Sequence, residues 1–472
     1  MAFEINFLTI LAAFIAISLI VTYLIKRFTK NPTFLIGSMV KTERPIKYFD
    51  MLARIGKPLE LFAEIGLVLG FGAVAADWLY GRGKGPIQRI SIFIFSASLL
   101  ASSMLVLDIL LAGAFSSSPL SSGVFPFIII AFAIFGFAGF GIMMLGVQAV
   151  EIIAKYMVGS EACPGIAPLI PGVEIPGVPI TPPVHAWLSL FIILIIHEAM
   201  HGILARQQGI RVKSTGVLLL GFLPVGGFVE PDEQQLMRAE PRKQLRVYAA
   251  GPTANLAAFP LSIGLLILML LSIGLVFGPW ASSIQEQSSI GVEIIGVTES
   301  TEYCGTTYQN PAFGVFEEGM QITSINGKES NNVGVIQGEI AANRFKPMTF
   351  GLRDSNADFN VTLAPNDLGA FGFAIENIEN PDFIVPEQYN TYSFAVNFLI
   401  EFIYWFIILN FLIAFVNFIP FFIFDWGRIA PFIYAPYLAS FMSEEEARKF
   451  VSRATMIIIL ALFFINVLPL IL

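Results

Sequence analysis

Three side chains that can bind and activate a metal ion lie in one apolar stretch, Ala186–Leu204, which reads AWLSLFIILIIHEAMHGIL. His197 and His201 are four residues apart, so on a helix both imidazoles share a face and can bind the same ion. This H-E-x-x-H pattern favours zinc, with Glu198 as the general base beside it. A charged side chain at the centre of a bilayer costs about 2.5–3.5 kcal/mol, so we interpret these residues as functional.

The motif has a simpler explanation, and the chain has one further histidine. The H-E-x-x-H spacing can arise by chance in a soluble helix, but the apolar surroundings of this stretch disfavour that explanation, because unpaired polar groups are costly in hydrocarbon. The third histidine of the chain, His185, follows Pro182 and Pro183 at the water end of the same stretch. We interpret His185 as an interfacial residue without a catalytic role.

The composition is that of a membrane protein. Hydrophobic residues make up 56% of the 472 residues and the mean hydropathy is +0.74, whereas soluble domains contain about 45–50% apolar residues. The basic residues are scattered and no nucleic-acid-binding motif is present. Length and apolarity predict about eight transmembrane spans: Phe7–Ile25, Leu61–Tyr80, Ile90–Phe115, Val124–Val150, Ala186–Ala205, Val247–Phe277, Phe394–Ile419 and Met456–Leu472.

Lysine and arginine residues predict the orientation of the spans. The segments Lys26–Lys57, Arg206–Arg246 and Arg428–Arg453 carry 19 of the 27 basic residues, and all three lie on one side if eight spans alternate. We expect this side to be the cytoplasm, with the histidine motif towards the inner half of its span. The basic residues of the segment 82–89 do not fit this rule, because alternating spans would place them on the outer side. The span Leu61–Tyr80 could therefore instead be re-entrant or interfacial.

A segment on the expected outer side has a different composition. Residues 281–391 contain 15 acidic and four basic residues, a net charge of −11. Short β-branched runs at 292–297, 320–325, 348–352 and 359–363, separated by turn residues, predict a compact β-rich domain over residues 285–371. We interpret residues 377–392 as a polar linker that follows this domain. Cys163 and Cys304 either form one disulfide on this side or remain separate thiols.

A catalytic zinc ion takes about three protein ligands and leaves one position for water. The strongest remaining candidate is Asp425, which follows the apolar span Phe394–Phe424 and should reach the same depth as His201. Position alone also allows an ordinary aspartate at a helix end. A third ligand elsewhere, such as a glutamate in a different metallopeptidase group, is a further alternative.

These motifs occur in an order that resembles the site-2 protease family of intramembrane zinc metalloproteases. HEAMH in a span is followed by a glycine-rich apolar stretch, AAGPTAN, an outer domain and NFIP…FDWG in a late span. The resemblance covers Ala186 to about Ile429. It implies that His197, His201 and Asp425 bind zinc and that Glu198 activates water.

The resemblance also implies a substrate-binding region. The stretch Gly216–Glu230 corresponds to a re-entrant β-hairpin beside the active site, whose edge would capture unwound substrate as an added strand. The alternative is a cytoplasmic loop that lies on the membrane surface. Within it we expect Gly226, Gly227 and Phe228 to bind substrate. Asn417 matches an asparagine thought to hold the substrate backbone. The outer domain is similar to the PDZ domains of bacterial-type site-2 proteases, proposed there to filter substrates by size.

One departure from the family pattern concerns the turn after Asp425. The chain reads Phe424-Asp425-Trp426-Gly427 where the family usually has Leu-Asp-Gly, so the glycine is displaced by one residue. The first spans, within residues 1–158, have no counterpart in the minimal core of the family. The expected catalytic core comprises residues 184–280 and 394–472, interrupted by the outer domain.

The sequence therefore predicts an α-helical polytopic membrane protein with a small extracytoplasmic, β-rich, PDZ-like domain and a re-entrant β-hairpin. The expected function is zinc-dependent hydrolysis of peptide bonds within or near the transmembrane helices of single-span membrane proteins. The expected location is the plasma membrane, with the active site towards the cytoplasm and no nucleic-acid partner. The alternative is a non-proteolytic membrane scaffold or transporter with a structural metal site.

Overall fold

The structure is a computed structural model that describes residues 7–29, 32–112, 125–175, 180–221, 223–303, 306–354, 357–421 and 424–471. Within these ranges, seven helices are long and apolar enough to cross a membrane. They are α3 (Lys57–Tyr80), α4 (Pro86–Ala112), α5 (Phe125–Met157), α6 (Ala186–Gln207), α8 (Pro241–Ser288), α10 (Glu387–Phe418) and α12 (Glu444–Val467).

These seven helices coincide with seven of the eight expected spans. The remaining expected span, Phe7–Ile25, falls on α1 (Phe7–Phe28), whose first side chains lie outside the described part of the chain. The protein is thus mostly helical and compatible with a multi-pass membrane protein. The number of spans stays a prediction.

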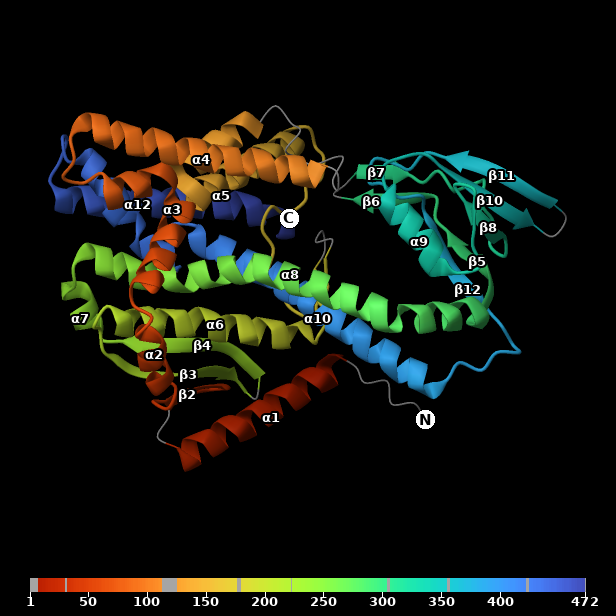
Figure 1. Ribbon diagram of the computed structural model, residues 1–472, viewed down its shortest axis with the longest axis horizontal. Helices are drawn as coiled ribbons and strands as arrows, with labels where there is room; N and C mark the ends of the chain where they lie inside the picture. The colour runs from red at the N-terminus through yellow and green to blue at the C-terminus, as the bar shows by residue number, and fades with distance from the viewer. Residues whose placement is uncertain are drawn as a thin grey trace.

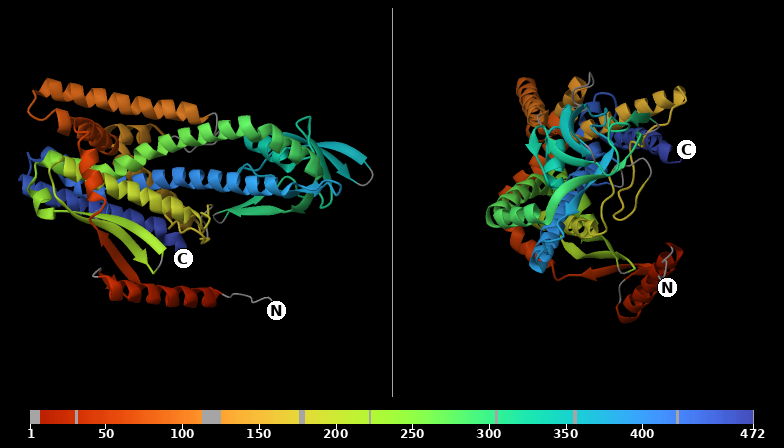
Figure 2. Two further views of the ribbon diagram at one scale, coloured as in Figure 1. Left: turned by 60° about the horizontal axis from the view of Figure 1, so that its bottom comes forward. Right: turned by 90° about the vertical axis from the view of Figure 1, so that its right-hand side faces the viewer.

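Most of the long helices run along the long axis of the molecule, and α8 and α10 extend beyond the others into a β-rich domain at one end (Figure 1). Helix α8 has 48 residues and is therefore about 72 Å long at about 1.5 Å per residue. This is more than twice the roughly 30 Å of a bilayer's hydrocarbon core. The same pair of helices connects the two parts of the molecule in the left view of Figure 2.

Helix α3 differs from the other long helices because it runs across their direction (Figure 1). Near its start, Glu64 accepts hydrogen bonds from Arg242 and Arg246. Near its end, Asp77 accepts from Arg89 and from Tyr437.

Arg242 and Tyr437 belong to two of the basic segments expected on the cytoplasmic side, so both ends of α3 contact that side. Helix α3 is also one of the seven helices that are long and apolar enough to cross a membrane, so the re-entrant or interfacial alternative for this segment stays a prediction.

A four-stranded antiparallel sheet lies beside α6, with strand order β1-β2-β3-β4. Its strands are β1 (Thr33–Phe34), β2 (Gly37–Thr42), β3 (Val212–Leu220) and β4 (Leu223–Pro231). Strands β3 and β4 form the hairpin expected over Gly216–Glu230. The sequence did not predict β2, which pairs with β3 from Gly37↔Leu220 to Thr42↔Thr215. Thus β2 covers one edge of the hairpin and leaves β4 at the other edge.

The β-rich domain contains a six-stranded antiparallel sheet in the order β11-β10-β8-β5-β12, with β9 beside β8, and a separate β6-β7 hairpin. A single helix, α9, packs with it around a core that includes Ile294, Ile325 and Phe350. The elements are β5 (Ser289–Val297), β6 (Ser300–Tyr303), β7 (Thr306–Gln309), β8 (Gln321–Ile325), β9 (Lys328–Glu329), α9 (Val333–Ala342), β10 (Met348–Asp354), β11 (Ala357–Leu363) and β12 (Phe373–Glu379). The four expected strand runs are confirmed as β5, β8, β10 and β11.

The expected end of this domain at residue 371 and the expected linker 377–392 both differ from the structure. Strand β12 continues the sheet to Glu379 by pairing with β5, and α10 already begins at Glu387. In β12, Phe373, Ile375 and Ile378 are partly buried while the acidic residues are exposed. The polar residues read as a linker are therefore the exposed side of an edge strand.

The expected pairing of the two cysteines is only partly covered by the described residues. Cys163 is disulfide-bonded, whereas Cys304 lies outside them.

The membrane part of the molecule packs around a buried cluster that joins α3, α5, α8, α10 and the segment after α10. Its large members include Phe71, Phe418 and Trp426, all fully buried. The short helices are α2 (Ile46–Ala53), α7 (Glu233–Arg238), η2 (Asp425–Arg428), α11 (Ala430–Tyr434), η3 (Ala435–Leu438) and η4 (Leu468–Leu470).

Candidate metal centre

Helix α6 presents two histidines on one face. His197 and His201 are one turn apart, and their ring centroids are 4.9 Å apart. Both imidazoles are largely buried, with side-chain exposures of 7% and 12%. The expected alignment of the two rings on one helix face is therefore present in the structure.

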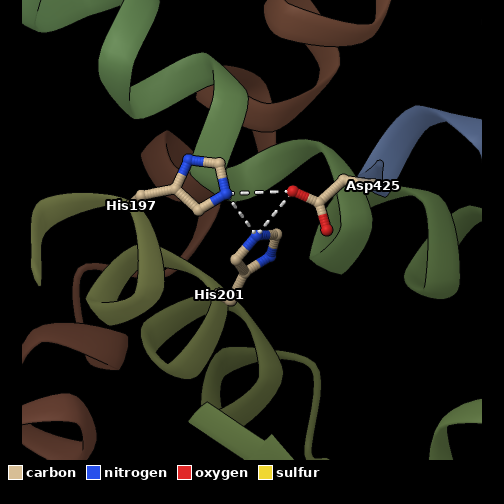
Figure 3. Close-up of side chains that lie close together, drawn as sticks. All are labelled: His197, His201 and Asp425. Carbon is tan, nitrogen blue, oxygen red and sulfur yellow. Dashed lines mark hydrogen bonds and ion pairs between the residues drawn. The ribbon is translucent and has the colours of Figure 1, made fainter. Parts of the chain in front are cut away.

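Asp425 lies at the start of η2 and faces both histidines (Figure 3). Its Oδ2 is 3.0 Å from Nε2 of His197 and 3.1 Å from Nε2 of His201, and the two nitrogens are 3.2 Å apart. Three electron-rich atoms this close repel each other unless a cation or shared protons lie between them. Among the described residues, this is the one group of histidine and acidic side chains placed to hold a metal ion.

The spacing of the three donor atoms fits tetrahedral coordination. Zinc bonds to nitrogen or carboxylate oxygen are about 2.0–2.1 Å long, so the ligand atoms of a tetrahedral site lie about 3.3–3.4 Å apart. The observed separations of 3.0–3.2 Å are slightly shorter than this. Three protein donors would leave one coordination position for water or substrate, as in catalytic sites.

A glycine of helix α8, Gly251, packs against the two histidine rings on one side of the centre. A Cβ atom on Gly251 would lie 2.4 Å from Nε2 of His201 and 2.5 Å from Nε2 of His197. Such distances are well below van der Waals contact. Gly251 thus provides space for the two ring nitrogens at the point where they converge.

The outer nitrogen of each histidine ring contacts α8. Nδ1 of His201 donates to the carbonyl of Val247 at 2.7 Å. A carbonyl can only accept, so this bond places the ring proton on Nδ1 and leaves Nε2 with its lone pair.

Nδ1 of His197 lies 3.0 Å from Nδ2 of Asn255, a fully buried side chain whose Oδ1 has no partner among the described residues. A half-turn of the amide would bring Oδ1 to this position, where it could accept from an Nδ1–H. This arrangement satisfies the orphaned oxygen and directs the lone pair of Nε2 towards the metal site. The donor set and its surroundings therefore fit a metal ion.

Glu198 lies between the two histidines and contacts the hairpin. Its Oε2 accepts from the backbone N–H of Val229 at 3.0 Å. A Cβ on Gly227 would lie 3.2 Å from Cγ of Glu198, so β4 packs closely against α6 at this point. One carboxylate oxygen of Glu198 is thus held by the backbone of β4, next to the two histidines.

The other expected substrate-binding residues are not all beside the centre. Gly226 packs under Leu218, and the ring of Phe228 covers Gly216 on the sheet. Asn417 lies in the last turn of α10 and donates to the carbonyl of Ile413 in its own helix. Gly227 is therefore the member of the expected set in direct contact with Glu198.

His185 lies at the opposite end of α6 from the centre. Its ring is 3.2 Å from Glu401 of α10. This position agrees with the interpretation of His185 as a residue without a catalytic role.

Sequence reasoning missed three contacts of the centre. Gly251 and Asn255 of the AAGPTAN stretch contact the histidines directly, although the sequence alone assigned neither residue to the site. The asparagine itself could have indicated its contact with the site, because a polar side chain in an apolar helix needs a partner. The contact between Val229 and Glu198 involves a backbone N–H, which no side-chain pattern could reveal.

Two comparisons with known proteins agree with this geometry. The sequence pattern of peptidase family M50 matches residues 185–462. The chain is also 29% identical over 233 residues to the uncharacterized protein MJ0971 of Methanocaldococcus jannaschii, an alignment that covers 49% of this chain and 52% of that protein. The chain thus spans about half the length of this curated relative.

Proposed function

This chain belongs to peptidase family M50, the site-2 protease family of metalloproteases, and from that membership we propose that it is an intramembrane zinc endopeptidase. Its substrates would be single-span membrane proteins, cut within or near their transmembrane helix. The observation that carries the proposal is the convergence of His197, His201 and Asp425, with donor atoms 3.0–3.2 Å apart and Glu198 beside them.

We assign His197, His201 and Asp425 as the zinc ligands. A zinc ion bound there would polarise the scissile carbonyl and lower the pKa of bound water towards about 7. Val247 and Asn255 would orient the two imidazoles, and Gly251 would keep the space between them open. The four side chains that the chemistry needs are all present, which argues against a vestigial or purely structural site.

Glu198 is the proposed general base and acid. The Val229 N–H engages Oε2 of Glu198, so Oε1 is the oxygen that would accept a proton from the attacking water. Glu198 would then deliver that proton to the amine of the departing peptide, which restores its carboxylate. The hydrogen bond from β4 keeps the carboxylate in position during both transfers.

The free edge of β4 is the proposed substrate-binding strand. A helical substrate hides its carbonyls in intramolecular hydrogen bonds, so it must unwind before hydrolysis, and an extended chain can then pair with a sheet edge. Strand β4 is the last strand of its sheet and contacts Glu198 at Gly227. Because β2 pairs with the outer edge of β3, substrate would be directed to the edge beside the catalytic residues.

The remaining expected contacts are less direct. Gly226 and Phe228 would support the binding strand by packing on β3, and Asn417 would hold the substrate backbone from the end of α10. The β-rich domain, carried by α8 and α10, is proposed to be PDZ-like and extracytoplasmic. There it would restrict which membrane proteins reach the active site, consistent with a role in regulated intramembrane proteolysis.

The proposal can be tested with purified wild type and Glu198→Gln in lipid nanodiscs. Each protein is incubated with a panel of single-span fusion proteins. Wild type should release fragments whose new termini, mapped by mass spectrometry, lie within or next to the substrate span. Glu198→Gln should release none while retaining zinc. Equal cleavage by both proteins would exclude Glu198 as the base and attribute the activity to a contaminant or another site.

A further inference from the structure

Trp426 follows Asp425 directly, and its ring fills a socket built by α3 and α10. The side chain is fully buried. Its ring stacks on Phe71 at a centroid distance of 4.8 Å and meets Phe418 edge-on at 4.5 Å. A Cβ on Gly70 would lie 1.8 Å from Cζ3 of Trp426, so the socket admits this ring only because residue 70 is glycine.

Helix α3 contacts the chain after Trp426 at two more points. Phe71 meets Tyr434 edge-on at 5.6 Å. The hydroxyl of Tyr437 donates to Oδ2 of Asp77 at 2.6 Å and lies 3.3 Å from the carbonyl of Val74. The segment that begins at Asp425 is therefore held along α3.

The same helix also holds the part of α8 that contacts the histidines. Glu64 is buried and accepts from Arg242 at 2.7 Å and from Arg246 at 2.9 Å. Arg246 directly precedes Val247, whose carbonyl orients His201. A single helix thus contacts both the segment that carries Asp425 and the segment that backs the histidines.

Helix α3 is itself fixed by a crossing with α5. The α3 backbone breaks at Gly72, with φ 65° and ψ −152°, and the α5 backbone breaks in the same way at Gly136, with φ 62° and ψ −152°. A Cβ on Gly72 would lie 2.4 Å from the carbonyl oxygen of Ile134, and one on Gly136 would lie 2.3 Å from that of Leu69. The two breaks therefore interlock, and the crossing lies directly beside the socket for Trp426.

We propose that α3 positions Asp425 as the third metal ligand, and that it acts through Trp426 seated on Gly70 and Phe71. This role rests on the proposed zinc site. Asp425 belongs to a four-residue 3-10 helix, which is too short to fix a side chain by itself. Metal sites tolerate deviations of only about 0.2 Å in ligand distance, so the neighbouring residue must be held firmly. Trp426 is thus a positioning residue, and the region before residue 158 gains a function in the catalytic centre.

The test compares Gly70→Ala, Trp426→Leu, Trp426→Phe and the double variant Gly70→Ala/Trp426→Leu as full-length proteins in detergent. Zinc affinity is measured by competition with a chelator, and ligand geometry by the visible absorption spectrum of the Co²⁺-loaded proteins. The first two single variants should lose about 10–100-fold in zinc affinity, as outer-shell changes do, and show an altered Co²⁺ spectrum. Trp426→Phe, which keeps a ring in the socket, should stay near wild type.

The double variant should lose no more affinity than Trp426→Leu alone, because leucine lacks the ring atoms that an alanine at residue 70 would strike. Gly351→Ala is the matched control: its Cβ would lie 2.2 Å from Oγ of Ser324, a comparably close contact made within the β-rich domain. It should leave the Co²⁺ spectrum unchanged.

Two outcomes would overturn the positioning role. In one, Gly70→Ala and Trp426→Leu bind zinc as wild type does. In the other, they lose zinc only in proportion to lost folded protein, and the losses of the two single variants add in the double variant. If wild type itself binds no zinc, the proposed function fails, and this role fails with it.

Discussion

Substitution of Gly251 by alanine should disable the metal centre while leaving the fold in place. The added Cβ would lie 2.4–2.5 Å from both ring nitrogens that face Asp425. Ordinary contact between heavy atoms begins near 3.5 Å, so each ring must retreat by about 1 Å. That shift is about five times the deviation of about 0.2 Å that a metal site tolerates.

The effect on zinc binding should be much larger than the effect on stability. Displacement of two ligands should weaken zinc affinity by about 100-fold or more, which is about 2.8 kcal/mol of binding free energy. For folding, alanine is favoured over glycine in a helix by about 0.8–1.0 kcal/mol, while overpacking costs about 1–3 kcal/mol. The net cost to stability is therefore about 0–2 kcal/mol.

The assay is zinc competition on Gly251→Ala, with helical content followed by circular dichroism. Gly264→Ala in the same helix serves as the control, because a Cβ there meets no atom within 4 Å. The control should bind zinc as wild type does. Wild-type zinc affinity in Gly251→Ala would refute the proposed packing of α8 against the histidines.

Three further predictions concern the surroundings of the centre. Asn255→Leu should weaken zinc binding by about 10–100-fold, because Nδ1 of His197 loses its partner; unchanged affinity in the competition assay would remove Asn255 from the site. A zinc chelator should abolish cleavage, and Zn²⁺ but not Mg²⁺ should restore it, since imidazole ligands disfavour Mg²⁺; activity that survives complete chelation would exclude a metal mechanism. Glu64→Gln should destabilise the protein by about 2 kcal/mol, because Arg242 and Arg246 lose the charged acceptor that they share and Arg246 keeps only its ion pair with Glu60; denaturant unfolding measures this, and a change below about 1 kcal/mol would contradict it.

The sequence predicted the parts of the centre that depend on local pattern. His197, Glu198 and His201 share one helix, so their spacing and apolar surroundings were sufficient. Asp425 is 228 residues from His197, and no periodicity connects positions so far apart. Only the resemblance to a family motif favoured Asp425 over a helix-end aspartate.

Contacts between distant segments account for what the sequence did not reveal. The pairing of β2 with β3 joins residues near 40 with residues near 217, and strand propensity does not specify a partner. The socket for Trp426 depends on Gly70, a residue that looks like any other glycine in an apolar helix. The polar side of β12 was read as a linker because an edge strand and an extended linker share the same composition.

The zinc content of single variants tests the central claim most directly. Wild type and Glu198→Gln, purified without chelator, should each contain about one zinc ion per chain. His197→Ala, His201→Ala and Asp425→Ala should each lose it while keeping their helical content. Full zinc content in Asp425→Ala would contradict the account, because the third ligand would then lie elsewhere in the chain.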